Sequence, residues 1–105
     1  MPKGTEHGEL WWALADKRRP VIVVSRDDPR GARTLTTIVV VTRRARGLPS
    51  EVTLDERDGL PRSSVANCDD LTTIAKARLI RRVGRLSEPK ILELDEALRF
   101  SLQLD

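Results

Sequence analysis

The chain has 105 residues and a formal net charge of +3, and its single cysteine rules out an internal disulfide. With only one histidine, a conventional zinc site is not expected, and nothing in the sequence calls for another cofactor. No stretch approaches the ~20 apolar residues of a membrane-spanning helix, and no apolar signal-peptide core is present, so a cytoplasmic protein is expected.

The positive charge lies mainly in the first half of the chain. Residues 1–50 contain ten Lys and Arg against five Asp and Glu, whereas residues 51–105 contain nine against eleven. This asymmetry favours a polyanionic partner or an acidic protein. A solvated basic surface with no partner is the alternative that charge alone leaves open.

The N-terminal part of the chain predicts a leader and a first strand. Residues 1–7 are expected to form a flexible leader and residues 8–105 a single domain. Residues 9–14 predict a strand whose alternation places Trp12 in the core and leaves Trp11 for solvent, a dimer partner or a nucleobase.

The β-branched segments that follow predict further strands. These cover residues 21–25, entered through Pro20, then residues 35–42, residues 51–54 and residues 63–68.

The C-terminal part predicts one helical turn within residues 75–80, a sixth strand at 82–86 and a helix that begins after Ser87 as N-cap. The helix carries an apolar stripe at positions 91, 94, 98 and 102. Short strands with turn signals every 8–12 residues predict a mainly β protein, a small antiparallel barrel with a C-terminal helix.

Cationic and hydroxyl side chains stand where apolar strands begin and end. A guanidinium offers a two-pronged fork to phosphate oxygens and stays charged at any relevant pH, so Arg18 and Arg19 are candidate phosphate ligands. Thr42 ends a buried strand and could donate its hydroxyl to a phosphate oxygen. Charged loops and an ordinary β-forming threonine are the alternatives. An arginine cluster at Arg43, Arg44 and Arg46 is a further candidate for binding phosphate.

Two carboxylates follow the fifth predicted strand, at Asp69 and Asp70. A carboxylate beside a phosphate-binding arginine can act as general base toward a 2′-hydroxyl. An Asx turn or a helix cap is the alternative explanation. Cys68 lies in an apolar predicted strand and is expected in the core. It is not expected to be a nucleophile, because no histidine lies near it to activate its thiol, and His7 lies in the expected leader.

Five segments occur in order along the chain. They are Gly8-Glu9-Leu10-Trp11-Trp12, Arg18-Arg19-Pro20-Val21-Ile22-Val23-Val24-Ser25, Val41-Thr42, Asn67-Cys68-Asp69-Asp70-Leu71-Thr72-Thr73-Ile74 and Arg82-Val83-Gly84-Arg85-Leu86-Ser87. Together they resemble the MazF/PemK family of bacterial toxin endoribonucleases, the toxin halves of type II toxin–antitoxin pairs. The similarity runs from Gly8 to Leu104.

The resemblance implies an SH3-like barrel, a homodimer and metal-independent cleavage of single-stranded RNA to a 2′,3′-cyclic phosphate and a 5′-hydroxyl. It also implies an acidic, partly disordered cognate antitoxin that folds across the basic groove. Arg19 and Thr42 match active-site positions of the family, and Asp69 matches a proposed general base.

The same chemistry follows from the residues. Asp69 would take the 2′-proton, and Arg19 with the Thr42 hydroxyl would stabilise the phosphorane oxygens. The proton for the leaving oxygen would come from Arg18, Arg43 or water, because Asn67 has none to transfer. The residues expected to bind RNA are Arg18, Arg43, Arg44, Arg46, Asn67, Asp70 and Trp11.

Two other classes of function remain open at this point. A toxin of the same barrel family could poison DNA gyrase by binding, with its target contacts on the C-terminal helix. A catalytically silent SH3-like module could bind RNA or an acidic peptide. Neither needs the combination of Arg19, Thr42 and Asp69, so cleavage of RNA in EDTA separates them from the ribonuclease.

Overall fold

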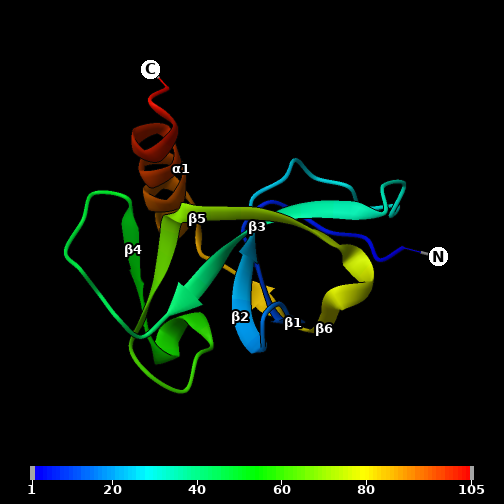
Figure 1. The fold of residues 1–105 in the computed structure, drawn as a ribbon, viewed down its shortest axis with the longest axis horizontal. Helices are drawn as coiled ribbons and strands as arrows, with labels where there is room; N and C mark the ends of the chain where they lie inside the picture. The colour runs from blue at the N-terminus through cyan, green and yellow to red at the C-terminus, as the bar shows by residue number, and fades with distance from the viewer. Residues whose placement is uncertain (1, 105) are drawn as a thin grey trace.

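The computed structural model describes residues 2–104 and contains one curled antiparallel sheet of six strands with a C-terminal helix (Figure 1). The strands lie in the order β4-β5-β3-β2-β1-β6. The helix lies beside β4 and β5 at one end of the sheet. This half-barrel with a terminal helix confirms the predicted fold class.

The elements run along the chain as follows: β1 (Glu9–Leu14), β2 (Arg18–Val23), β3 (Leu35–Thr42), β4 (Glu51–Leu54), a 3-10 turn η1 (Glu56–Asp58), β5 (Ser64–Ala75), a second 3-10 turn η2 (Lys76–Arg78), β6 (Leu79–Arg85) and α1 (Glu88–Leu102). The bounds predicted for β1, β3 and β4 are confirmed. β2 begins before Pro20, which lies within the strand opposite Trp12. β5 continues seven residues beyond the predicted end at residue 68.

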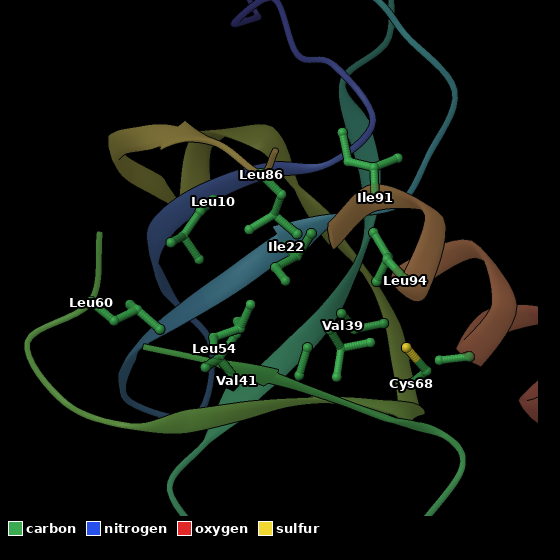
Figure 2. Close-up of a cluster of buried hydrophobic side chains, with 13 residues drawn as sticks. Leu10, Ile22, Val39, Val41, Leu54, Leu60, Cys68, Leu86, Ile91 and Leu94 are labelled. Carbon is green, nitrogen blue, oxygen red and sulfur yellow. The ribbon is translucent and has the colours of Figure 1, made fainter. Parts of the chain in front are cut away.

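Buried aliphatic side chains fill the concave side of the sheet (Figure 2). Ile22 and Val39 from neighbouring strands are fully buried, and Leu94 of α1 closes the same cluster. Cys68 belongs to this core, as predicted, and burial raises the pKa of its thiol to about 11. The thiol is therefore protonated at neutral pH.

The helix begins and ends at recognisable caps. Ser87 is the N-cap, as predicted, and its hydroxyl accepts a hydrogen bond from the amide of Lys90. Gln103 ends the helix with a left-handed φ of 57°. Of the expected stripe, Ile91 and Leu94 are buried, Leu98 is half-buried and Leu102 is exposed. No helix within residues 2–104 has the length and apolar character needed to cross a membrane.

A bulge in β5 decides where its polar side chains point. Val39 of β3 pairs with Leu71, but the next residue, Val40, pairs with Asn67. Residues 68–70 are therefore extra residues on β5 without partners on β3. Such an insertion redirects side chains that strict alternation would place on one face.

The predicted faces of β1 are wrong for its two tryptophans. Trp11 is buried, with 7% of its surface exposed, whereas Trp12 is half-exposed. Trp11 packs in a second apolar cluster with Ala13, Val21 and Val23. Strict alternation assumes one buried face, but the curled sheet covers both faces of β1, and the pairing of β1 with β6 shifts register on either side of the tryptophan pair.

The segment expected as a flexible leader packs against the domain. Thr5 is buried and exchanges backbone hydrogen bonds with Asp28, at 2.9 and 2.7 Å. The ammonium of the buried Lys76 binds the carboxylate of Asp28 and the carbonyl of Lys3. This ion pair joins the N-terminal segment, the loop after β2 and η2.

Candidate active site

The side chains of Arg19 on β2 and Thr42 on β3 line one surface groove together with Asp70 on β5. We call this the Arg19 groove, and its volume is about 410 Å³. Its lining residues are Asp16, Arg19, Val40, Thr42, Arg44, Arg46, Asn67, Asp70 and Thr72. Three adjacent strands thus contribute a guanidinium, a hydroxyl and a carboxylate to one concave surface.

Arg19 is held in the groove by a carboxylate from the turn between β1 and β2. Its Nε and Nη2 atoms donate to the two oxygens of Asp16 at 2.8 and 3.1 Å. This hydrogen-bonded pair raises the pKa of Arg19 and holds that of Asp16 well below its usual range, and the charge of Asp70 further raises the pKa of Arg19. The guanidinium is therefore a fixed cation with about a quarter of its side chain open to solvent.

Thr42 links the groove to the loop that follows β3. Its hydroxyl oxygen accepts a hydrogen bond from the amide of Arg44 at 3.3 Å. That bond does not use the hydroxyl hydrogen, which can donate to a ligand oxygen. The predicted placement of Thr42 at the rim next to Arg19 is thus found in the structure.

Asp69 does not join Arg19 and Thr42 in this groove, contrary to our expectation. One carboxylate oxygen accepts from the Ser50 hydroxyl at 2.6 Å and the other from the Ser101 hydroxyl of α1 at 2.7 Å. These two bonds hold the pKa of Asp69 below its usual value. A carboxylate used in this way ties β5 to the helix.

The bulge in β5 explains why Asp70, and not Asp69, lines the Arg19 groove. In a regular strand Asn67 and Asp69 would share a face, and Asp70 would point to the other. The extra residues bring Asp70 onto the side of Asn67, so that these two line the groove. Asp70 thus occupies the place that we predicted for Asp69.

The predicted arginine cluster forms a loop that is organised by Glu51. The Glu51 carboxylate accepts hydrogen bonds from the amides of Arg46, Gly47 and Leu48 at 2.8 to 3.2 Å. Several amides converging on one anion form a nest. The nest fixes the backbone from which Arg46 reaches the Arg19 groove.

A second and larger cavity, of about 730 Å³, adjoins the first. We call it the Trp12 cavity, and it shares Arg19, Thr42 and Arg44 with the Arg19 groove. Its cationic lining residues are Lys17, Arg18, Arg19, Arg43, Arg44 and Arg62. Among residues 2–104, no aspartate or glutamate lines it.

The predicted RNA-binding residues divide between these two surfaces, with one exception. Arg18 and Arg43 line the Trp12 cavity, Arg46, Asn67 and Asp70 line the Arg19 groove, and Arg44 lines both. The exception is Trp11. Its indole is buried and donates to Glu9 at 3.1 Å, so it is not available to a base.

The sequence patterns did not predict Asp16, Glu51 and Trp12 as residues of the site. Asp16 left a readable signal, because a carboxylate three residues before Arg19 across a short turn is placed to pair with it. No local signal pointed to Glu51 or Trp12. The role of Glu51 depends on the conformation of the arginine loop, and that of Trp12 depends on which face of β1 the rest of the sheet buries. His7, in turn, lies against α1, with Nε2 at 2.6 Å from Asp95 and Nδ1 at 3.0 Å from the Val24 carbonyl oxygen.

Within residues 2–104 no three His, Cys, Asp or Glu side chains gather in a way that could hold a metal ion.

Comparisons with known proteins agree in pointing to one family. A model described as "PemK-like, MazF-like toxin of type II toxin-antitoxin system" matches residues 6–102. A curated relative named "Probable endoribonuclease MazF5", from Mycobacterium tuberculosis, is 38% identical over 100 residues, covering 90% of each chain. "Endoribonuclease MazF3" from the same species is 37% identical over 93 residues, covering 89% of this chain and 90% of the relative.

Solved structures give the same result. The Mycobacterium tuberculosis toxin MazF-mt6 superposes with a TM-score of 0.87 at 35% identity, covering 92% of this chain and 98% of the other. A MazE–MazF crystal structure (Form-II) from Deinococcus radiodurans gives a TM-score of 0.81 at 27% identity, covering 97% and 98%. The chain therefore belongs to the PemK-like, MazF-like toxin family of type II toxin–antitoxin systems.

Proposed function

We propose that this chain is a sequence-specific, metal-independent endoribonuclease toxin that cleaves single-stranded RNA through attack of the RNA's own 2′-hydroxyl. The observation that carries the proposal is the Arg19 groove, where a guanidinium, a hydroxyl and a carboxylate line one cavity. The relatives are named endoribonucleases, which supports RNA cleavage over gyrase binding or silent binding.

The phosphodiester is held by Arg19 and Thr42. In-line attack of the 2′-oxygen places extra negative charge on the non-bridging phosphate oxygens. A fixed guanidinium and a hydroxyl donor that face those oxygens stabilise this charge in the transition state. To reach the phosphate, Arg19 shares or gives up its hydrogen bonds to Asp16.

Asp70 takes the role of general base that we first expected for Asp69. It lines the groove with Arg19 and Thr42, whereas both oxygens of Asp69 accept from serine hydroxyls. Asp70 removes the 2′-proton as the 2′-oxygen bonds to phosphorus, and the bond to the 5′-oxygen breaks. The products are a 2′,3′-cyclic phosphate and a 5′-hydroxyl.

Water supplies the proton to the leaving 5′-oxygen in this proposal. Asn67 has no transferable proton, and a guanidinium, the group that Arg18 and Arg43 carry, does not act as a proton donor to a leaving oxygen. These two arginines stabilise the departing charge instead.

The protein partners follow from the family. Among the structural neighbours are MazE–MazF crystal structures. We propose that an acidic segment of a cognate antitoxin covers the basic surface formed by the Arg19 groove and the Trp12 cavity, and that the toxin acts as a homodimer in the cytoplasm, where messenger RNA is available. The charge complementarity of these cavities to a carboxylate-rich peptide supports the first part.

Cleavage in a chelator tests the proposal. Purified protein is incubated with single-stranded RNAs of diverse sequence in EDTA, and the fragments are examined for 2′,3′-cyclic phosphate and 5′-hydroxyl ends. Arg19→Ala is expected to reduce the rate by orders of magnitude, whereas Arg30→Ala, an exposed arginine outside both cavities, retains it. Intact RNA at high enzyme concentration contradicts the proposal.

A further inference from the structure

The Trp12 cavity has the composition of a nucleotide subsite rather than of a simple cationic patch. Apolar side chains, among them Pro20, Val41 and Leu60, form part of its lining, and six cations and two hydroxyl side chains form the rest. A volume of about 730 Å³ lies within the range of small-ligand sites. An apolar surface among cations suits a ligand with a flat, weakly polar part and a polyanionic part.

Trp12 offers the flat surface. Trp12 is partly exposed and lines the cavity, and the guanidinium carbon of Arg18 lies 5.6 Å from the ring centroid. A planar cation therefore already lies over the face of this ring. Aromatic side chains bind bases of single-stranded RNA by such stacking, with little dependence on base identity.

The position of the cavity relates it to the cleaved bond. Because Arg19, Thr42 and Arg44 line both cavities, a phosphate held by Arg19 and Thr42 lies at their shared border. One nucleotide joined to that phosphate then enters the Trp12 cavity, away from the carboxylates of the Arg19 groove.

We infer that the Trp12 cavity is a base-binding subsite, in which the nucleobase next to the scissile phosphate stacks on Trp12 and displaces or is covered by Arg18. This inference rests on the proposed function, because it takes RNA as the ligand. It names Trp12 as the aromatic contact, in place of the buried Trp11.

The two adjacent tryptophans provide a matched pair for a binding experiment. The probe is a mixed-sequence 2′-O-methyl RNA decamer, which lacks the 2′-hydroxyl nucleophile and cannot be cleaved by this chemistry. In Trp11→Phe, which keeps Trp12, the probe is expected to quench tryptophan fluorescence. In Trp12→Phe, which keeps the buried Trp11, the quenching is lost. Equal quenching in the two variants overturns the inference.

Affinity measurements separate stacking from phosphate binding. Trp12→Ala is expected to bind the decamer about five- to a hundred-fold more weakly, as for loss of one stacked base, and Trp12→Phe to recover part of that loss. A decamer of the same backbone with abasic sugars should bind wild type and Trp12→Ala alike. Wild-type affinity of Trp12→Ala for the base-containing probe, or equal weakening for both probes, contradicts the subsite.

These outcomes are independent of catalysis. If the EDTA assay finds no RNA cleavage but Trp12-dependent binding persists, the proposed reaction fails and the subsite stands. If RNA is cleaved and Trp12 makes no difference to binding, the subsite alone is wrong.

Discussion

At the scale of single residues, Asp69 and Asp70 show how neighbouring carboxylates acquire different tasks. Asp69 accepts two serine hydroxyls, one of them from α1, and its pKa is lowered as a result. Asp70 lines the groove with Arg19 and adds to the rise in the pKa of that guanidinium. A base needs access to the substrate, and of these two carboxylates Asp70 is the one that lines the Arg19 groove.

Exchanging each carboxylate for an amide separates the two tasks. Asp70→Asn removes the proposed base, and we expect the single-turnover cleavage rate to fall about 100-fold or more, with RNA affinity little changed. Asp69→Asn weakens the bonds to Ser50 and Ser101, and we expect a lower melting temperature with a cleavage rate within a few-fold of wild type. The opposite pattern would restore Asp69 as the base.

At the scale of elements, the groove depends on irregular backbone rather than on ideal strands. The bulge in β5 turns Asp70 toward β2, and the nest around Glu51 shapes the arginine loop. Bulges and nests are typical of strand ends near functional sites. The side chains of the regular parts of the same strands form the hydrophobic core.

The role of Glu51 in the arginine loop predicts that removing its negative charge weakens the binding of RNA. Glu51→Ala leaves the amides of Arg46, Gly47 and Leu48 without their acceptor, so the arginine side chains are less ordered for RNA. We expect KM to rise by up to about tenfold with kcat little changed, the pattern of lost uniform binding. The control is Glu56→Ala, which removes the same charge from an exposed site and should leave KM unchanged or lower it. A lowered KM in both variants would refute the positioning role.

The packing of α1 on the sheet predicts that truncations on its buried face lower the free energy of unfolding more than truncations on its exposed face. Leu94 is fully buried in the core shown in Figure 2, whereas Leu92 is 64% exposed. Leu94→Ala leaves a cavity and is expected to lower the free energy of unfolding by about 2–5 kcal/mol. Leu92→Ala should change it by less than about 0.5 kcal/mol. Urea unfolding of both variants measures the difference, and equal values would mean that the helix is not docked as described.

At the scale of the whole molecule, long-range contacts close the half-barrel. The buried Lys76, near the end of β5, binds Asp28 in the loop after β2 and the carbonyl of Lys3 near the N-terminus. Asp28 also accepts from the amides of Ala32 and Arg33. Residues far apart in sequence are thus held by one buried cation.

The Lys76–Asp28 pair predicts a specific acid response. With help from the amides of Arg33 and Ala32, it lowers the pKa of Asp28 from 3.8 to about 2, so the stabilising contribution is largely present above pH 4 and is lost as the pH falls toward 2. Lys76→Met removes the ammonium, and its deficit in melting temperature relative to wild type should be largest above pH 4 and shrink toward pH 2. Thermal melts of both proteins between pH 2 and 6 test this, with Glu56→Gln as the control. A deficit that does not change with pH contradicts it.

Local sequence patterns were sufficient to predict the fold class, most of the strands, the helix with its Ser87 cap, and the positions of Arg19 and Thr42 at strand ends. β-branched runs, turn residues and caps act over a few neighbours, so their effect is readable locally. The family likeness rested on the same local segments.

Contacts between distant parts of the chain set which carboxylate meets Arg19, which tryptophan is the more exposed and which anion shapes the arginine loop. The bulge at residues 68–70 changes the face of every polar side chain around it, and its position depends on pairing with β3. The curl of the sheet buries Trp11 on a face that alternation assigns to solvent. Strand register and the burial of each strand face are set by strands that are distant in the chain, so a local sequence pattern does not predict them.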